Sequence, residues 1–182
     1  MASNPVCLFQ VEELRVRRLS RRDLAHCREL GARCPDYLVL HYGAPDVEIV
    51  VGDLLEDLPP GKEAHDKFGL GFFDAEGRMV GGVDLIRDYP EPRTWYLGLM
   101  LLDPECRRRG LGAKLFARVG QWLHEQGAEA LRLAVADHNG GGRRFWDRMG
   151  FTPVKQVTSR YGLRDNLMHV MQRPLPVETW GG

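Results

Sequence analysis

The sequence predicts an α/β (α+β) fold, in which helices flank a mixed and mostly antiparallel central sheet. Strand-like and helix-like segments follow one another along nearly the whole chain, without repeats or low-complexity linkers. A hairpin is evident near the middle, and an apolar strand after it leads into a long amphipathic helix. The 182 residues, 43% hydrophobic and 27% charged, suffice for a hydrophobic core. We expect a single domain over residues 1–182, with its core at about 14–173.

The first predicted elements are a strand and two helices. Residues 14–19 alternate between apolar and polar side chains, as in a strand with one buried face. Ser20, with Asp23 three residues later, resembles a capping box that begins a helix over about 21–33. A second helix is expected over residues 47–58, because two prolines and a glycine follow it directly.

The central part predicts three antiparallel strands. Residues 67–73 and 78–86 are strand-like, and the polar turn 74–77 between them ends in glycine, so we expect a hairpin. Residues 95–102 follow a proline-containing turn at 88–93 and are apolar almost throughout. Such a strand is typically buried on both faces, which places it at the centre of the sheet.

The C-terminal part alternates between helix and strand. Apolar residues at helical spacing predict a long helix over about 110–126, which a glycine ends. A strand at 131–135 and a short helix at 141–149 follow, and then two more strands at about 154–160 and 166–172. The complete predicted order is β-α-α-β-β-β-α-β-α-β-β.

Charge and hydropathy exclude several kinds of partner. Lys+Arg and Asp+Glu both number 25, so no net charge would draw the protein onto nucleic acid or an anionic membrane. The N-terminus lacks a basic start followed by an apolar region, and no stretch approaches the ~18 apolar residues of a membrane span. We therefore expect a cytoplasmic protein without nucleic-acid or membrane partners. No pattern specifies an oligomeric state, and a homodimer stays open.

The cysteines do not indicate a metal site. Cys7, Cys27, Cys34 and Cys106 are scattered without a CxxC pair, so neither zinc nor a disulfide framework is predicted. We expect reduced thiols and no bound metal. Cys27 and Cys34 are seven residues apart, on one face of a helix, where small apolar side chains are commonly buried.

The segment between the central strand and the long helix is the most informative. It contains Arg107, Arg108 and Arg109, followed by Gly110 and Gly112. The amide N–H groups of a first helical turn lack internal partners, and the helix dipole adds about half a positive charge there. Glycines let a phosphate approach the main chain, and arginines add fixed positive charge. Three adjacent arginines alone are more often a solvated surface, but the strand and helix on either side favour a phosphate cradle.

At this segment the chain resembles the GNAT acetyltransferase superfamily. The family signature is Arg/Gln-x-x-Gly-x-Gly/Ala at the start of the helix after the central strand, and Arg107, Gly110 and Gly112 match it. A second family motif, Asn-x-x-Ala-x-x-Phe-Tyr-x-x-x-Gly-Phe, follows the next strand. Its matching positions are Asn139, Phe145, Gly150 and Phe151. Gly142 replaces the alanine and Trp146 replaces the tyrosine.

The resemblance implies the GNAT fold and acetyl-CoA as co-substrate. The strands on either side of the long helix would separate at a bulge, and the pantetheine arm would add to the exposed backbone of the central strand. Asn139 would contact this arm from the far side, although an asparagine there equally suits a helix N-cap. The implied cofactor-binding residues are Met100, Leu101, Leu102, Arg107, Arg108, Arg109, Gly110, Leu111, Gly112, Ala113, Asn139 and Trp146.

Asp84 is the candidate for the catalytic base. A primary amine with a pKa of ~10.4 is almost fully protonated at pH 7, so its free base costs about 4.6 kcal/mol. Asp84 shares a strand face with Val80, Gly82 and Ile86, and an acid among apolar residues is costly unless it is paired or employed. The alternative is a structural role, holding an arginine or a backbone N–H. Tyr96 lies near the position where some family members carry a basic glutamate, and it is the second catalytic candidate.

The leaving thiolate needs less assistance than the amine. In many family members the tyrosine of the second motif protonates the departing sulfur, but the indole of Trp146 cannot act as an acid near neutral pH. Packing beside Phe145 is the alternative role for this side chain. Because a thiol has a pKa of ~8.5, the thiolate can depart without a strong acid, and other tyrosines or water remain alternative donors.

These features predict an acetyl-CoA-dependent N-acetyltransferase that acts on the primary amine of an unidentified acceptor, with a small molecule favoured over a protein. Tyr37, His41 and Tyr42 follow the first helix, where this fold commonly builds its acceptor wall, although they equally suit a hydrophobic loop. His138, next to Asp137 at a strand end, is either a proton relay or a solvated histidine. The missing tyrosine favours an alternative, a non-catalytic acyl-CoA-binding or regulatory module.

Overall fold

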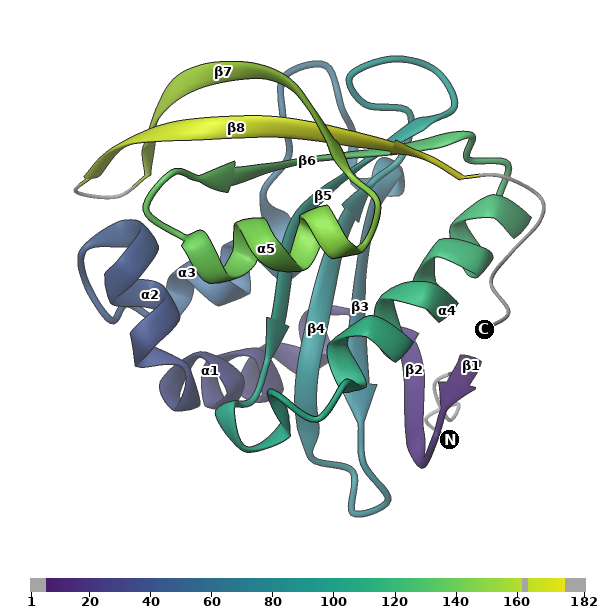
Figure 1. Cartoon of the computed structure of the whole chain (residues 1–182). Coiled ribbons are helices and arrows are strands. Elements are labelled where there is room, and N and C mark those ends of the chain that lie inside the picture. The colour runs from purple at the N-terminus through teal and green to yellow at the C-terminus, as the bar shows by residue number, and fades with distance from the viewer. Residues whose placement is uncertain (1–5, 162–163, 176–182) are drawn as a thin grey trace.

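The computed structural model describes residues 6–161 and 164–175 of the chain. In this part, eight strands form one sheet in the order β1-β2-β3-β4-β5-β6-β8-β7 (Figure 1). Neighbouring strands are antiparallel except β5 and β6, which are parallel. The strands are β1 (Cys7–Val11), β2 (Leu14–Arg18), β3 (Lys67–Phe73), β4 (Met79–Ile86), β5 (Thr94–Leu102), β6 (Ala130–Ala136), β7 (Thr152–Tyr161) and β8 (Arg164–Pro174).

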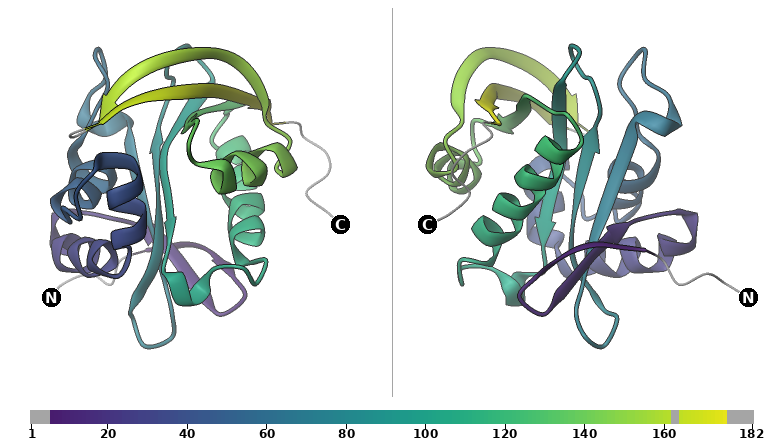
Figure 2. Two further views of the ribbon diagram at one scale, coloured as in Figure 1. Left: turned by 60° about the vertical axis from the view of Figure 1, so that its left-hand side comes forward. Right: turned by 90° about the vertical axis from the view of Figure 1, so that its right-hand side faces the viewer.

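Helices cover both faces of the sheet, as the sequence predicts. α1 (Leu24–Arg33), α2 (Pro35–Tyr42) and α3 (Glu48–Val51) lie on one face, and α4 (Leu111–Glu125) and α5 (Gly140–Arg148) lie on the other (Figure 2). Each face has its own hydrophobic core. No helix in the described part of the chain is long and apolar enough to cross a membrane.

α4 illustrates how the sequence buries a helix against the sheet. Leu115, Val119, Trp122 and Leu123 recur at helical spacing, and each is at most 7% exposed. Trp122 meets Trp95 of β5 with its ring centroid 5.9 Å away. Burial of a large apolar side chain contributes about 1.5–3 kcal/mol, so this face holds α4 firmly across the sheet. The N-terminus of α4 is thereby placed next to the end of β5.

β5 and β6 run side by side only over their first halves. Their parallel pairing ends at Leu97 and Leu133, after which β5 stays with β4 and β6 stays with β8. The β4–β5 register shifts after Asp84, where Gly98 is an extra residue and forms a β-bulge. The two central strands therefore diverge beyond the bulge, which is the separation that the family resemblance implies.

The predicted element order is confirmed from residue 67 onward, but it lacks two earlier elements. β1 is the first, and Phe9 and Val11 extend the core before residue 14. α2 is the second, although Pro35 in its first turn and Gly43 after its end, with a φ of 84°, are helix start and stop signals. Both elements are short, with 5 and 8 residues, so their patterns are weak.

The helix predicted over residues 47–58 is only partly α-helical. α3 ends at Val51, and a π-helical segment, Gly52–Glu56, continues it. The Leu54 carbonyl of this segment lies directly over Gly69 of β3, where a Cβ atom would collide with it. The missing side chain therefore lets the backbone of the π-helical segment reach the sheet, beside the diverging strands.

The start predicted for the first helix agrees with the structure, but Cys27 and Cys34 do not share one helix, because α1 ends at Arg33. The capping box of Ser20 and Asp23 is present, and it begins a 3-10 turn before α1. All four cysteines are free thiols, and Cys27 and Cys34 are fully buried. Cys34 lies between α1 and α2, where the chain changes direction.

Candidate functional site

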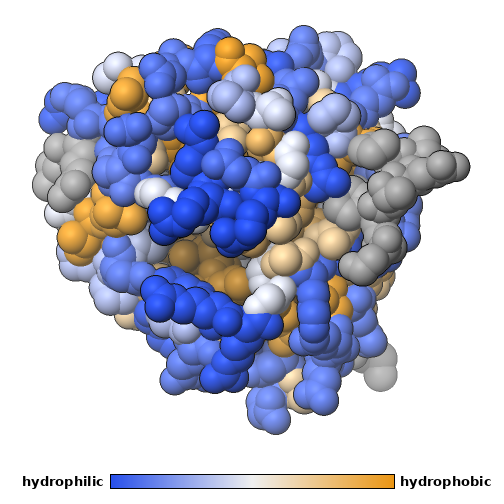
Figure 3. Space-filling model, in the orientation of Figure 1, coloured by the Kyte–Doolittle hydropathy of each residue, from blue (hydrophilic) through white to orange (hydrophobic). Residues whose placement is uncertain are grey.

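The divergence of β5 and β6 opens a cleft of about 1290 Å³. Figure 3 shows it as a hollow with a hydrophobic floor between rows of hydrophilic residues. The predicted site residues that line it are Asp84, Tyr96, Met100, Leu101, Leu102, Arg107, Arg108, Gly110, Gly112, Ala113, Asn139 and Trp146. Arg109 is exposed outside this lining, and Leu111 packs against the core under α4, so their part in cofactor binding stays a prediction.

The loop before α4 forms one end of the cleft. Gly110 precedes the helix with a φ of 77°, and no side chain caps the first turn. A Cβ on Gly110 would meet nothing within 4 Å, and one on Gly112 would come no closer than 3.5 Å to Leu102 and Phe145. The first turn of α4 thus presents its amide N–H groups and the positive end of its dipole to open space, an arrangement that can hold phosphate oxygens.

Arg107 connects this loop to α2. Its Nε donates to the Leu102 carbonyl at 2.8 Å, and its guanidinium is paired with Asp36 at 2.5 Å. The side chain is only 30% exposed, so these contacts fix its direction. Arg108, in contrast, is exposed and lines the cleft. Phosphate binding by either arginine stays a prediction, but Arg107 already has partners within the protein.

Met100, Leu101 and Leu102 line the middle of the cleft. On one side they pair with β4, but the β5–β6 ladder has already ended at Leu97 and Leu133. The second backbone edge of this segment therefore faces the opening, as strand addition by an extended ligand requires, but its Leu102 carbonyl already accepts a hydrogen bond from Arg107 Nε.

Asn139 caps α5 and also contacts α2. Its Oδ1 accepts a hydrogen bond from the Gly142 N–H at 2.9 Å, so the N-cap interpretation is confirmed. Its Nδ2 lies 3.2 Å from His41 Nε2, and because an amide nitrogen only donates, the imidazole nitrogen accepts. Burial and the neighbouring His138 lower the pKa of His41 to about 4, which keeps the ring neutral. Contact between Asn139 and a pantetheine arm stays a prediction.

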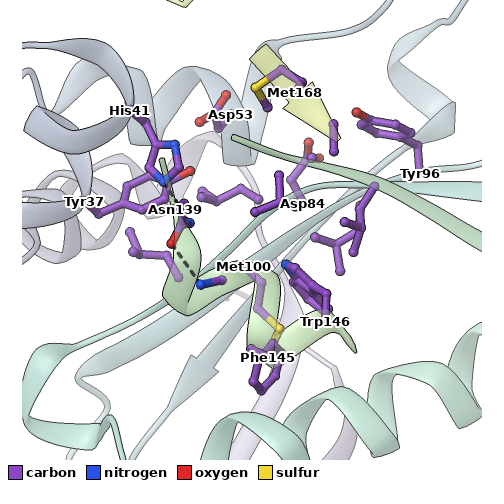
Figure 4. Close-up of a pocket in the computed structure, with 18 of the residues that line it drawn as sticks. Tyr37, His41, Asp53, Asp84, Tyr96, Met100, Asn139, Phe145, Trp146 and Met168 are labelled. Carbon is purple, nitrogen blue, oxygen red and sulfur yellow. Dashed lines mark hydrogen bonds between the residues drawn. The ribbon is translucent and has the colours of Figure 1, made fainter. Parts of the chain in front are cut away.

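Trp146 packs into an aromatic cluster. Its ring makes edge contacts with Phe116, Phe145 and Phe151, with centroids 5.5, 4.8 and 5.3 Å away. The side chain is 9% exposed and its edge lines the cleft (Figure 4). The packing role considered from the sequence is therefore present, and the indole also forms part of the cleft wall.

Asp84 lies deep in the cleft, where Figure 4 shows its carboxylate pointing inward. Its Oδ1 accepts a hydrogen bond from Lys67 Nζ at 2.8 Å, and the two side chains are 8% and 5% exposed. Burial raises the pKa of Asp84 to about 7; Lys67 opposes this shift, and Asp53 and Asp57 add to it. The structural partner of Asp84 is thus a lysine, neither an arginine nor a backbone N–H.

A second carboxylate lies at the same end of the cleft. Asp53, in the π-helical segment, accepts a hydrogen bond from the Tyr42 hydroxyl at 2.9 Å. Burial raises the pKa of Asp53 to about 6, with the hydrogen bond from Tyr42 opposing the shift. Tyr37 and His41 also line the cleft, with ring centroids 4.5 Å apart. The three residues considered for the acceptor wall therefore do lie in one wall, and they belong to a helix.

Tyr96 extends from β5 on the opposite side of this end. Its ring makes an edge contact with Tyr89, with the centroids 5.6 Å apart, and both residues line the cleft. His138 and Asp137 lie outside the lining. His138 Nε2 is 3.0 Å from the Leu40 carbonyl oxygen, and Asp137 is paired with His169 at 2.7 Å. Both therefore contact neighbouring segments of the protein.

The sequence predictions missed Asp53, Asp57, Lys67 and Gly98. Lys67 begins an apolar strand, and Gly98 interrupts another, which is a sign of a bulge or of a close backbone approach. These two signals are visible in the sequence. Asp53 and Asp57 fall in the helix predicted over 47–58, where acidic residues commonly face solvent, so nothing local marked them.

Comparison with known proteins agrees with this geometry. A model of the acetyltransferase (GNAT) family matches residues 35–151. The mycothiol acetyltransferase of Beutenbergia cavernae is 30% identical over 90 residues, which cover 50% of this chain. The match spans only 29% of the length of that relative.

Solved structures show the same fold. An acetyltransferase from Thermus thermophilus has a TM-score of 0.72 at 24% identity, over 91% of this chain and 99% of that one. The spermidine N-acetyltransferase from Vibrio cholerae, solved in complex with CoA and spermine, has a TM-score of 0.66 at 18% identity, over 90% and 96% of the two chains. Because the family model covers well over half of the 182 residues, the chain belongs to the GNAT family of acetyltransferases.

Proposed function

We propose that the protein is an acetyl-CoA-dependent N-acetyltransferase that acetylates the primary amine of a small-molecule acceptor. The observation that carries this proposal is the presence of two features in one cleft. One is the N-terminus of α4, which has no side-chain cap and whose amide N–H groups suit phosphate oxygens, and the other is the carboxylate of Asp84. Membership of the GNAT family supports acyl transfer as the reaction.

The phosphate end suits the diphosphate of coenzyme A. Gly110 and Gly112 leave room for phosphate oxygens at the amide N–H groups of α4. Arg108, Arg144 and Arg148 also line the cleft and add positive charge to it. One structural neighbour was solved with CoA bound. The free edge of β5 then offers backbone partners to the amides of the pantetheine arm.

Asp84 suits the task of removing a proton from the acceptor. Its pKa of about 7 means that the carboxylate is available near neutral pH and is still basic enough to accept a proton. Bound acetyl-CoA supplies an activated acyl group, whose carbon–sulfur bond breaks as the carbon–nitrogen bond forms. Trp146 is no proton donor near neutral pH, so the thiolate departs without an acid from this position.

The shape of the acceptor end favours a small molecule. Walls come from α2, from the π-helical segment, from Tyr89 and Pro90 in the β4–β5 loop, and from Val157 and Met168 in β7 and β8. A recess with walls from these separate elements suits a compact amine better than a folded protein surface. Carboxylates of Asp53, Asp57 and Asp84 in the lining favour a cationic ammonium group over an anionic acceptor.

Turnover on a panel of small amines tests the proposal. The assay follows release of free CoA from acetyl-CoA, and we expect Asp84→Asn to lower kcat by about 10²-fold or more. Calorimetry should show nearly unchanged acetyl-CoA affinity, because Asp84 lies away from the phosphate end. Asp74→Asn, in the distant β3–β4 turn, is the matched control and should behave as the wild type.

The same assay separates the proposal from the non-catalytic alternative, which the tryptophan at position 146 favours. A protein that binds acetyl-CoA tightly but acetylates no amine in the panel would support a binding or regulatory module. Normal turnover of Asp84→Asn at pH 7 would instead keep the enzyme and remove Asp84 as its base.

A further inference from the structure

Asp84 is held at the bulge of β5 in an unusual way. Gly98 is the unpaired residue of the bulge, and a Cβ atom on it would lie well inside van der Waals contact of Asp84 Oδ2. The Asp84 carboxylate therefore occupies the space that a Cβ atom at position 98 would need, and only glycine leaves that space empty. Any larger residue at 98 would force the carboxylate or the strand to move.

Lys67 fixes the other oxygen of the same carboxylate. Its Nζ donates to the carbonyl oxygens of Asp53 and Asp57 at 2.6 and 2.7 Å, and to Asp84 Oδ1 at 2.8 Å. Three acceptors match the three protons of an ammonium group, whereas a neutral amine has only two protons to donate. The side chain is 5% exposed, so this cation belongs to the interior and is already fully engaged.

The two oxygens of Asp84 are thereby distinguished. Oδ1 is bound to Lys67, whereas Oδ2 has no hydrogen-bond partner among the described residues, 6–161 and 164–175. Asp84 lines the cleft although its side chain is only 8% exposed. Oδ2 is accessible from the cleft, because the buried side-chain atoms without a partner in the described residues are Arg107 Nη2, Arg118 Nη1 and His124 Nδ1. A proton-bearing ligand in the cleft can therefore supply the hydrogen bond that Oδ2 lacks.

We propose that Lys67 and Gly98 are positioning residues that present Oδ2 of Asp84 to the acceptor ammonium. Lys67 holds Oδ1, and Gly98 leaves the space that Oδ2 occupies. This inference rests on the proposed amine acetylation. The ammonium gives one proton to Oδ2, and its freed electron pair forms the bond to the acyl carbon. The carbon–sulfur electron pair leaves with sulfur, and the second proton lost from nitrogen passes to sulfur or to water.

Lys67 also governs when Asp84 can accept a proton. Three charged groups act on Asp84: Lys67 of β3, Asp53 of the π-helical segment, and Asp57, which directly follows that segment. Tyr96 of β5 lines the same end of the cleft. Lys67 is the cation in this set, and it lowers the pKa of Asp84. Without it, burial and the two other aspartates would hold the proton on Asp84 at higher pH.

The first test measures the pH dependence of Lys67→Met, which keeps the length and apolar stem of the side chain. We expect the acidic limb of kcat/KM, near pH 7 in the wild type, to move up by about one unit or more. Lys62→Met is the matched control, because Lys62 is paired with Asp66 and does not line the cleft. A uniform loss of activity without movement of the limb would show a merely structural lysine and overturn the proposal.

A pH titration of the Asp84 carboxyl group, followed by ¹³C NMR, also tests whether Lys67 lowers its pKa, and it needs no acceptor. The Asp84 signal is assigned by its loss in Asp84→Asn, and its midpoint should rise in Lys67→Met but not in Lys62→Met. If the wild type acetylates no amine, the proposed function fails, whereas the titration still decides whether Lys67 controls Asp84. An unchanged midpoint would overturn the role of Lys67.

The second test is a double-mutant cycle, which needs no change at Lys67. Gly98→Ala should lower kcat by about 10²-fold by displacing Oδ2, with little change in the KM for acetyl-CoA. In the Asp84→Asn background the same substitution should have almost no further effect, because both changes remove one interaction. Losses that simply add would show that Gly98 acts independently of Asp84, and would overturn its assigned role.

Discussion

At the scale of single residues, the loop before α4 divides its tasks between glycine and arginine. Arg107 donates to Asp36 and to the Leu102 carbonyl within the protein, and its buried Nη2 is left without a hydrogen-bond partner. Gly110 adopts a φ of 77°, which side chains rarely allow. Gly112 keeps the space in front of the first turn of α4 open. We therefore expect the backbone to contribute more to cofactor binding than any single arginine does.

Gly112→Glu tests this expectation at the cofactor end. Bulk and negative charge next to the diphosphate should abolish acetyl-CoA binding, as measured by calorimetry on the folded variant. Gly112→Ala is the control for packing, since its Cβ would lie at an ordinary 3.5 Å from Leu102 and Phe145. Arg109→Ala should reduce affinity only slightly. Unchanged affinity in a folded Gly112→Glu variant would contradict the assignment of this loop.

At the scale of elements, α2 and α5 close the cleft from two directions and contact each other. His41 of α2 accepts a hydrogen bond from Asn139, the N-cap of α5, and Asn166 of β8 donates to the His41 carbonyl at 3.2 Å. The first turn of α5 consists of three glycines, which favour the unfolded chain through their backbone freedom. The N-cap hydrogen bond of Asn139 therefore contributes substantially to the stability of the first turn of α5.

Replacing two of these glycines by alanine should change the free energy of unfolding in opposite directions. Gly140→Ala should raise the free energy of unfolding by up to about 1 kcal/mol, because alanine favours the helix. Its Cβ would meet only the flexible end of Arg144, at 3.4 Å. Gly142→Ala should lower the free energy of unfolding by about 1 kcal/mol, because the new Cβ would lie 2.5 Å from Asn139 Nδ2 and disturb the cap. Urea unfolding measures the free energy of unfolding of both variants. Changes of the same sign would refute the capping argument.

At the scale of the whole molecule, buried titratable groups couple the cleft to stability. Burial raises the pKa of Asp84 to about 7 and that of Asp53 to about 6. A carboxyl group that binds its proton more tightly in the folded state stabilises the fold at low pH, and this contribution is lost as pH rises through the folded pKa. His41 acts in the opposite sense. Its pKa is lowered to about 4, so its contribution is present at high pH and is lost as pH falls.

The contribution of Asp84 can be isolated by comparing two proteins. As pH falls from 8 to 5, the free energy of unfolding of the wild type should rise relative to that of Asp84→Asn, because only the wild type gains a proton at this site on the way through pH 7. Urea unfolding at several pH values measures the difference. Asp74→Asn should follow the wild type. Parallel curves for the wild type and Asp84→Asn would show that the carboxyl group titrates equally in both states.

The sequence by itself determined the features that depend on near neighbours. The hairpin of β3 and β4, the apolar strand β5 and the amphipathic helix α4 all follow from periodicity within one element. The glycines and arginines before α4 predicted a phosphate-binding loop, and the structure places that loop at one end of the cleft. Phosphate binding by the loop stays a prediction. Short elements such as β1 and α2 escaped prediction, since five to eight residues carry too weak a pattern.

Only the tertiary structure decided how Asp84 is held. The period of two in a strand assigned it to a face, but the bulge at Gly98 and the lysine 17 residues earlier, Lys67, determine where its carboxylate points. Asp53 and Asp57 lie near Asp84 because the backbone of the π-helical segment packs against Gly69. This is a contact between parts of the chain that are distant in the sequence. Such contacts depend on strand register and on close backbone approach, which no local pattern specifies, so the acceptor end of the cleft emerges only in the folded molecule.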